Sequence, residues 1–248
     1  MPDHDPDSHR RCHGHVFPKS GATAVGAEDT DLLDAGLRAW TAPPAGQDQK
    51  YPDSQLGTVE AMPANPLGVA LRNRRAGHHT LVWARPDLQA PEFTLTSPAF
   101  DHGAPIPEKH RGRLFGANVS PALNWTQPPA GTVELVLIAQ DPDVPVGKPA
   151  THALTRGIDP SLNGIPENAL ANPSPIPGLR HGKGPLGRRG WAGPMPIRSH
   201  GPHAYVFQLF ALDQVPGLPV GFALDEVIAA MSGHIIGRAR LDGTYEIR

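Results

Sequence analysis

The stretch that decides the fold is TVELVLIAQ, residues 132–140, which runs directly into DPDVP, residues 141–145. A nearly continuous apolar run of this length is typical of a β-strand that is buried on both faces. The two carboxylates that follow are flanked by prolines, which fix their own φ and so leave the carboxylates little rotational freedom. A polar turn that merely caps a strand has the same appearance, so this stretch alone predicts a buried strand but no function.

Further strands are expected on both sides of this one. Residues 93–96 alternate apolar and polar side chains, residues 205–212 (YVFQLFAL) are rich in aromatic and apolar side chains, and residues 235–245 form a last candidate that carries Arg238 and Arg240 on one side. Turn-forming residues separate these runs. With 27 Gly and 30 Pro in 248 residues, the composition favours many turns and loops over a helical bundle.

One helix is clear near the C-terminus. Its apolar positions have helical spacing, acidic residues occupy its first turn, and a glycine is placed to end it. The residues concerned are Leu224, Val227, Ile228 and Met231, then Asp225 and Glu226, then Gly233. Several strands and one late helix favour a β-sandwich over alternating β and α units. A shorter amphipathic candidate covers residues 66–75, with Leu67, Ala70 and Leu71 expected on its apolar side.

The chain divides into three parts by composition. Residues 1–61 are polar, rich in Gly, Pro, Asp and His and without a sustained period, so we expect a disordered tail. Met62 is a candidate for the true start of translation. Residues 62–90 form a lead-in segment, and residues 91–248 form the domain itself. The tail holds a His/Cys cluster (His4, His9, Cys12, His13 and His15), for which weak metal binding by a flexible segment is the expected limit.

Charge and cysteine content restrict the function classes. The formal net charge is −2, so no strong overall basic field is expected that would attract nucleic acid or an anionic membrane. Cys12 is the only cysteine, which rules out an intrachain disulfide and favours a reducing compartment. No secretion signal and no membrane-spanning apolar run is visible. We therefore expect a cytoplasmic protein with no integral membrane segment.

Two familiar kinds of motif match the sequence, but the residues around them do not support the corresponding function. Residues 182–187 (GKGPLG) match a dinucleotide-binding pattern, but a proline lies inside it and no helical pattern follows. The glycosylation-type triplets that begin at Asn118 and Asn124 are expected to be chance matches in a chain without a secretion signal.

Three segments carry residue types suited to chemistry. The first is Asp141 to Pro145; the second contains His152 in an expected strand; the third runs from Gly193-Pro194 to His203 and Tyr205. The last two residues lie two apart, so they share one face of a strand. Gly193 would let a backbone N–H approach a ligand closely. Each segment alone is equally compatible with a structural role, as a capped strand, a satisfied strand histidine or a loop.

Taken together, the ordered segments resemble the phosphatidylethanolamine-binding proteins, also called Raf-kinase-inhibitor-like proteins, over residues 93–246. The matching pieces are Ser120-Pro121-Ala122-Leu123-Asn124-Trp125, the DPDVP stretch, His152, Gly193-Pro194-x-Pro196, His203-x-Tyr205 and Gly243-Thr244-Tyr245. Residues 66–91 also look like the lead-in of actinobacterial-type members.

The resemblance implies an antiparallel Greek-key β-sandwich with a late C-terminal helix, long Gly/Pro loops and a small anion pocket at one end. The implied ligand-binding residues are Asp141, Asp143, Pro145, His152, Gly193, Pro194, His203 and Tyr205. This chain departs from the family pattern at Ala153, where an aromatic residue is usual, at Ala204, where an arginine is usual, and at Ile197, where a proline is usual. These changes affect the rim of the expected pocket.

The residues themselves also predict an anion site. Two imidazoles and a phenol supply N–H and O–H donors to an oxyanion, and affinity is expected to fall as pH rises and the imidazoles lose their protons. The predicted function is therefore a non-catalytic binding protein, without cofactor, for a phosphate-bearing small molecule, a phospholipid headgroup or a phosphorylated partner.

Two alternatives remain open. One is a hydrolase or a metal-dependent enzyme that uses Asp141, His152 and His203. The other is regulation through contact with a partner protein by the basic loop at residues 176–201, which carries Arg180, Lys183, Arg188, Arg189 and Arg198.

Overall fold

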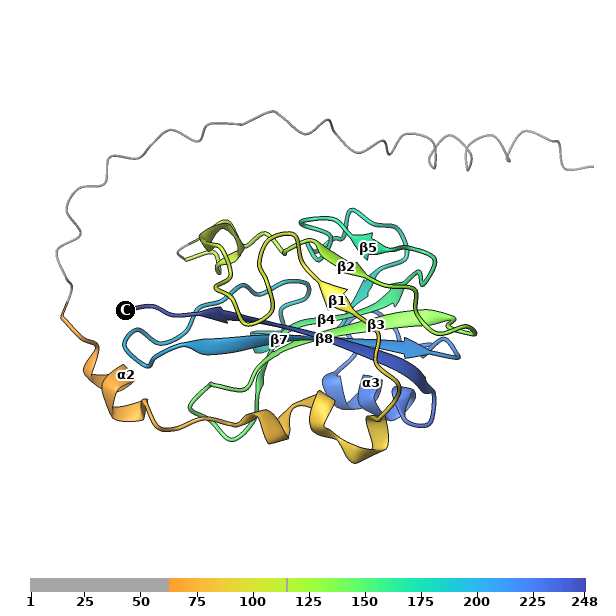
Figure 1. Cartoon of the computed structure of the whole chain (residues 1–248). Helices are drawn as coiled ribbons and strands as arrows, with labels where there is room; N and C mark the ends of the chain where they lie inside the picture. Colours follow the sequence, from red (N-terminus) through yellow and green to blue (C-terminus); the bar gives the residue numbers. More distant parts are fainter. Residues whose placement is uncertain (1–62, 115) are drawn as a thin grey trace, which may run out of the picture. The chain divides into compact units, whose positions relative to one another are not determined.

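The computed structural model describes residues 63–114 and 116–248 (Figure 1). The predictions for residues 1–61, namely a disordered tail with a His/Cys cluster, and the proposed start at Met62, lie outside these described residues. Among the described residues, no helix is long and apolar enough to cross a membrane.

A five-stranded sheet forms the centre of the domain. Its strand order is β6-β4-β3-β7-β8, and every neighbouring pair is antiparallel. The strands are β3 (Glu134–Asp141), β4 (Ala150–Ile158), β6 (Arg180–His181), β7 (His203–Leu212) and β8 (Ile235–Tyr245). The strand predicted at residues 132–140 is β3, shifted by one to two residues. It lies between β4 and β7, which explains why its hydrogen bonds are satisfied on both edges.

A smaller sheet packs on one face of the large one. Its strands are β1 (Leu95–Thr96), β2 (Leu123–Trp125) and β5 (Gly164–Ile165), in the order β1-β2-β5 and again antiparallel. The core between the sheets contains Leu123 and Ile165 from the small sheet and Leu137, Phe207 and Leu209 from the large one. The expected mainly β, antiparallel class with few helices is confirmed.

The other face of the large sheet is covered by helical segments (Figure 1). The side chains of Val136, Ile138 and Phe210 pack there against Val227 and Met231 of α3 (Leu224–Met231). Because both faces are covered, every residue of β3 is buried, as its apolar run predicted. Short 3₁₀ turns complete the lead-in and loops: η1 (His78–Thr80), η2 (Val82–Ala84), η3 (Pro86–Leu88), η4 (Glu108–His110) and η5 (Pro185–Gly187).

The helix predictions succeed at the C-terminus and fail in part in the lead-in. The structure places α3 where the periodicity indicated, and Gly233 follows it with φ of 81°. By contrast, α2 (Pro66–Leu71) is only six residues long, and its expected apolar side is wrong. Leu67 is 58% exposed, whereas the residue that α2 buries is Gly68. The reason is that α2 contacts the domain backbone to backbone rather than through apolar side chains.

Candidate functional site

The site lies at the end of the large sheet where β3 finishes and where β4 and β7 begin. Asp141 is the last residue of β3, and His203 is the first residue of β7. Their side chains are 3% and 2% exposed, and His203 Nδ1 lies 2.8 Å from Asp141 Oδ2. Because the pair is almost fully buried, the carboxylate depends on this imidazole for its charge compensation.

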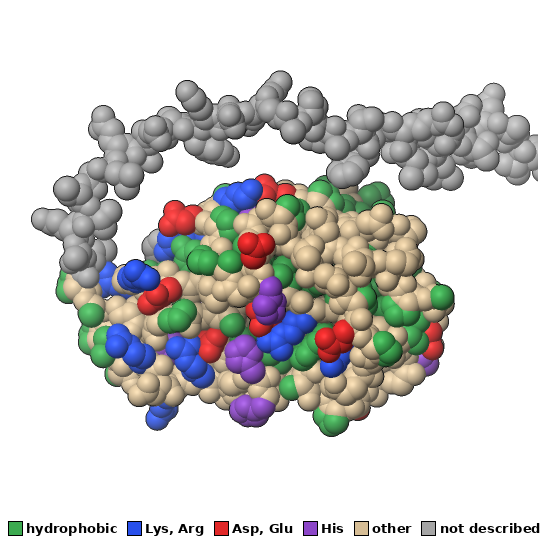
Figure 2. Space-filling model, in the orientation of Figure 1, with side chains coloured by type: hydrophobic (Ala, Val, Ile, Leu, Met, Phe, Trp, Pro, Cys, Tyr) green, Lys and Arg blue, Asp and Glu red, His purple; other side chains and the backbone are tan. Residues whose placement is uncertain are grey.

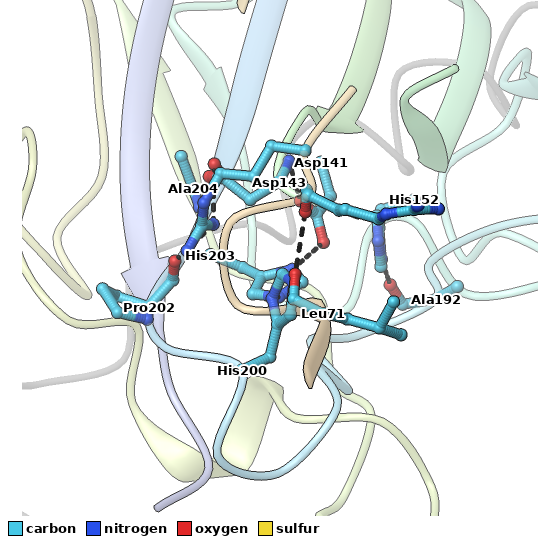
Figure 3. Close-up of polar contacts among 11 residues, drawn as sticks. Leu71, Asp141, Asp143, His152, Ala192, His200, Pro202, His203 and Ala204 are labelled. Carbon is cyan, nitrogen blue, oxygen red and sulfur yellow. Dashed lines mark hydrogen bonds and ion pairs between the residues drawn. The ribbon is translucent and has the colours of Figure 1, made fainter. Parts of the chain in front are cut away.

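The hydrogen bonds continue from this pair into the lead-in segment (Figure 3). His203 Nε2 lies 2.7 Å from His200 Nδ1, and His200 Nε2 lies 2.9 Å from Leu71 O and 3.2 Å from Arg74 O. Carbonyls only accept, so His200 Nε2 carries a proton, and His203 Nδ1 donates to the Asp141 carboxylate. The remaining hydrogen bond of this chain joins His203 Nε2 and His200 Nδ1.

The carbonyls that accept these hydrogen bonds from His200 belong to residues 63–77, a segment here named the N-terminal strap. Its Arg75 guanidinium lies 2.9 Å from Asp143 Oδ1 and donates to Pro202 O at 3.0 Å. The other Asp143 oxygen accepts the Ala204 N–H at 2.7 Å. Two strap amides pair with the turn after β3: Ala76 N–H with Val144 O, and Gly77 N–H with Pro142 O. The strap is therefore bound directly to the residues of the candidate site.

Close backbone packing allows the strap to lie where it does. A Cβ added at Gly68 would come within 2.0 Å of Arg198 O and 3.0 Å of His200 N. We expect Gly68→Val to detach the strap, at a cost of about 1–3 kcal/mol, because backbone atoms cannot move aside as a flexible side chain can. Limited trypsin digestion would show faster cleavage at Arg72 and Arg74. Val69→Ala, at an exposed neighbouring position, is the control, and equal cleavage rates in both variants would contradict the expectation.

His152, on β4 (Ala150–Ile158), provides one hydrogen-bonding atom without a partner. Its Nδ1 donates to Ala192 O at 2.5 Å, so in the neutral ring Nε2 carries the lone pair, and Nε2 makes no hydrogen bond within the described part of the chain. Burial lowers the pKa of His152, against the opposing effects of the Asp141 charge and the Ala192 carbonyl, while His203 lowers it further. The neutral ring is therefore favoured at neutral pH, and a bound anion would favour the protonated ring.

Tyr205 provides a second such atom, two residues after His203 on β7. Its ring packs edge-on against His152 with centroids 4.9 Å apart. Oη is buried and makes no hydrogen bond of normal geometry to the described residues. Burial raises the pKa of Tyr205 well above its ordinary value, as do the charges of Asp141 and Asp143, while the nearby Met195 amide acts in the opposite direction. The phenol therefore stays protonated and is available as a donor.

The Gly193-Pro194 loop is fixed by a residue that sequence reasoning had set aside. Asn118, which has φ of 56°, donates from Nδ2 to Trp191 O and accepts the Gly193 N–H at Oδ1, at 3.0 and 2.8 Å. The Gly193 N–H is thus used inside the protein rather than offered to a ligand. Glycine is required there because a Cβ would lie 2.1 Å from His110 O.

The structure brings the predicted residues to one end of the large sheet. Their polar groups differ in whether they are already paired within the protein or free to bind a ligand. Asp141, Asp143 and His203 are paired internally, whereas His152 Nε2 and Tyr205 Oη are unpaired. Pro145 is half-buried in the turn after β3, and Pro194 is buried. Across residues 63–114 and 116–248, no group of three or more His, Cys, Asp or Glu side chains is arranged to hold a metal ion.

Three positioning residues were missed from the sequence: Arg75, Asn118 and His200. Each acts through a contact with a segment far away in the chain, so no local pattern marks Arg75 or Asn118. For His200, the only available signal was its place three residues before His203.

Comparison with known proteins gives the family. The family model described as phosphatidylethanolamine-binding protein matches residues 96–246. The chain belongs to the phosphatidylethanolamine-binding protein family. This membership supports a binding protein of that type. The N-terminal strap lies outside the matched range.

Relatives and solved structures agree with this assignment. A UPF0098 protein from Methanothermobacter thermautotrophicus is 37% identical over 154 residues, which are 62% of this chain and 98% of the relative. A crystal structure of a phosphatidylethanolamine-binding protein homologue from Chlamydia trachomatis has 32% identity and a TM-score of 0.57, and covers 64% of this chain and all of its own. YbcL from Escherichia coli, described as a member of the mammalian family, has 26% identity and a TM-score of 0.59. The match covers 63% of this chain and 99% of YbcL.

Proposed function

We propose that this protein binds small phosphate-bearing ligands, without catalysing a reaction, at the end of the large sheet. The ligand set comprises Asp141, Asp143, Pro145, His152, Gly193, Pro194, His203 and Tyr205, of which His152 and Tyr205 contact the anion directly. The ligand is a phospholipid headgroup, a phosphorylated partner or a small phosphate ester.

The observation that carries the proposal is a pair of unpartnered atoms on adjacent rings: the buried Tyr205 Oη and His152 Nε2, whose ring bonds only through Nδ1. Leaving a buried hydroxyl without a partner costs about 1–3 kcal/mol, so a site that keeps one is suited to a ligand that satisfies it. A phosphate oxygen accepts from Tyr205, and either a P–OH group donates to neutral His152 or the ring takes up a proton and donates. The remaining set fixes these rings: the Asp141–His203 pair balances charge, and the Gly193-Pro194 loop borders the rings.

The test is calorimetric titration of the full chain with inorganic phosphate and with O-phosphorylethanolamine. We expect a dissociation constant near or below about a millimolar. His152→Ala and Tyr205→Phe should each weaken binding roughly tenfold or more, because each removes a charge-assisted hydrogen bond. No heat from a folded parent protein would contradict the proposal.

Two controls make this test specific. Tyr205→Phe should leave the free energy of unfolding unchanged within about 0.5 kcal/mol or raise it, because Oη has no partner to lose. Affinity should rise as pH falls from about 8 to about 5.5, because the anion favours the protonated His152 ring, whose pKa burial holds below its ordinary value. This dependence should be reduced in His152→Ala, and an unchanged pH dependence there would remove His152 from the site.

A further inference from the structure

The candidate site holds two carboxylates, whose charges oppose an anion unless they are balanced. Asp141 and Asp143 are linked directly, since the Asp143 N–H donates to Asp141 Oδ1 at 2.7 Å. Both charges reach the ring proposed to donate to the ligand, because they add to the effect of burial in raising the pKa of Tyr205. Asp141 is paired with His203 within the domain. Whether the site favours an anion therefore depends on what balances Asp143.

The group that balances Asp143 comes from the strap (Figure 3). Arg75 Nη1 lies 2.9 Å from Asp143 Oδ1 and donates to Pro202 O at 3.0 Å. The second carboxylate oxygen of Asp143 accepts the Ala204 N–H. The side chains of Arg75 and Asp143 are only 29% and 13% exposed. A pair this shielded is screened less by salt and water than a pair on the open surface.

Position 204 lacks the side chain that could balance Asp143 from within the domain. This chain has Ala204 where an arginine is usual in the family. Ala204 shares a strand face with Gln208, which accepts the Trp83 N–H of the lead-in segment. The strap leads directly into that segment, so a side chain at position 204 and Arg75 reach Asp143 from the same side of the sheet. Arg75 thus supplies the guanidinium that position 204 does not.

We propose that Arg75 is a positioning residue of the anion site and that docking of the strap switches this site on. With the strap docked, Arg75 balances Asp143 and the site accepts an anion. With the strap released, the uncompensated Asp143 charge opposes the anion. The inference rests on the proposed function and adds its regulation. Strap docking and anion binding are then linked, so each strengthens the other by the same factor.

The strap can leave the domain without opening its core. Of the described residues that form the two apolar clusters, none belongs to the strap. The large apolar side chains of the strap, Leu67 and Val69, are exposed. Segments with few buried apolar contacts open at a lower free energy than the core. Figure 2 shows Lys and Arg side chains at the end of the domain that carries α2, and Arg72 and Arg74 of the strap are exposed to a protease.

The experiment is calorimetric titration of full-chain variants with inorganic phosphate. Arg75→Ala should weaken phosphate binding about tenfold, because it leaves Asp143 without its cation. Gly68→Val, which is expected to detach the strap without changing a site residue, should weaken phosphate binding by a similar factor. Arg72→Ala is the matched control. It removes the same charge from the strap, but Arg72 donates to Ser199 O rather than to a carboxylate, so affinity should stay within about twofold of the parent.

Second substitutions separate charge balance from loosening of the fold. Adding Ala204→Arg to Arg75→Ala should restore phosphate affinity to within about threefold of the parent, because a guanidinium again faces Asp143. Adding Asp143→Asn to Arg75→Ala should recover most of the loss, because the amide has no charge and keeps an oxygen for the Ala204 N–H. A merely structural role of Arg75 predicts no recovery from Asp143→Asn.

Trypsin cleavage of the parent protein gives the reciprocal readout and needs no substitution. Saturating phosphate should slow cleavage at Arg72 and Arg74 about tenfold, the same factor by which strap docking strengthens phosphate binding. Phosphate should give little protection in Arg75→Ala, where docking no longer changes the charge at Asp143. This measurement decides the question even if a variant fails to fold.

Several results would overturn the inference while the proposed function stands. They are equal phosphate affinity in Arg75→Ala and the parent, equal losses in Arg72→Ala and Arg75→Ala, no recovery from either second substitution, and no protection of the strap by phosphate. Tighter binding in Gly68→Val would also overturn it, since the strap would then block the site. No heat with the folded parent protein contradicts the proposed function and, with it, a switch that acts on that site.

Discussion

His203→Ala should destabilise the domain by about 3–5 kcal/mol, a large share of the 5–15 kcal/mol that is typical for a domain. The substitution leaves the Asp141 carboxylate, whose side chain is 3% exposed, without its partner. It also removes the hydrogen bond to His200 and so weakens the attachment of the strap. Urea denaturation monitored by tryptophan fluorescence measures the first effect, and trypsin cleavage at Arg72 and Arg74 measures the second.

A double-mutant cycle identifies the cause. Asp141→Asn combined with His203→Ala should cost clearly less than the sum of the two single substitutions, because the uncompensated charge is then absent. His200→Ala, which keeps the buried ion pair, should release the strap with a smaller loss of about 1–3 kcal/mol. Additive losses at Asp141 and His203 would show that the pair is not the source of the destabilisation.

Phe207→Ala should cost about 3–5 kcal/mol and should also weaken phosphate binding. Phe207 is completely buried, stacks on Trp191 with ring centroids 5.6 Å apart and packs against Phe100 at 5.9 Å. Trp191 in turn packs against His152. The cavity left by the substitution therefore lies beside Trp191, the ring that packs against His152. Denaturant titration measures the stability, and phosphate calorimetry well below the melting temperature measures the binding.

Phe210→Ala is the matched control on the same strand. Phe210 is equally buried, but it points to the opposite face of the sheet, among the residues that contact α3. The Phe210→Ala variant should lose a similar amount of stability, while its phosphate affinity should stay within about twofold of the parent. Equal loss of affinity in both variants would mean that the effect comes from general loosening of the sheet rather than from support of His152.

The strands could be predicted from the sequence because a buried strand requires a regular pattern of apolar residues that are close together in the sequence. The last strand, β8, has the predicted limits, and β3 and β7 differ from them by at most two residues at each end. Local patterns were less informative where contacts are made by backbone. The Gly68 position illustrates this. The amphipathic pattern of α2 predicted that Leu67 would face the domain, but the buried residue is Gly68, whose missing side chain lets the strap backbone lie against the backbone of the domain. Similarly, Gly193 was expected to serve a ligand, and its observed contacts are with Asn118 and His110.

The candidate site, like the fold, was only partly predictable from the sequence. The sequence placed Asp141 at a strand end and His203 and Tyr205 on one strand face, and all three positions agree with the structure. It gave no indication that Arg75 pairs with Asp143 or that His200 links His203 to the strap. These contacts join residues separated by 68 and 129 positions or fall within a loop whose course depends on the rest of the fold.

By itself, the sequence determined the fold class, the main strands, the C-terminal helix and the family, because apolar periodicity and ordered motifs are properties of neighbouring residues. Only the tertiary structure decided which polar groups are free. His203 and Asp143 have the right chemistry for a ligand but are occupied by partners, while His152 and Tyr205 keep one unpaired atom each. The physical reason is that hydrogen-bond pairing depends on distances between segments, which the sequence fixes only through the whole fold.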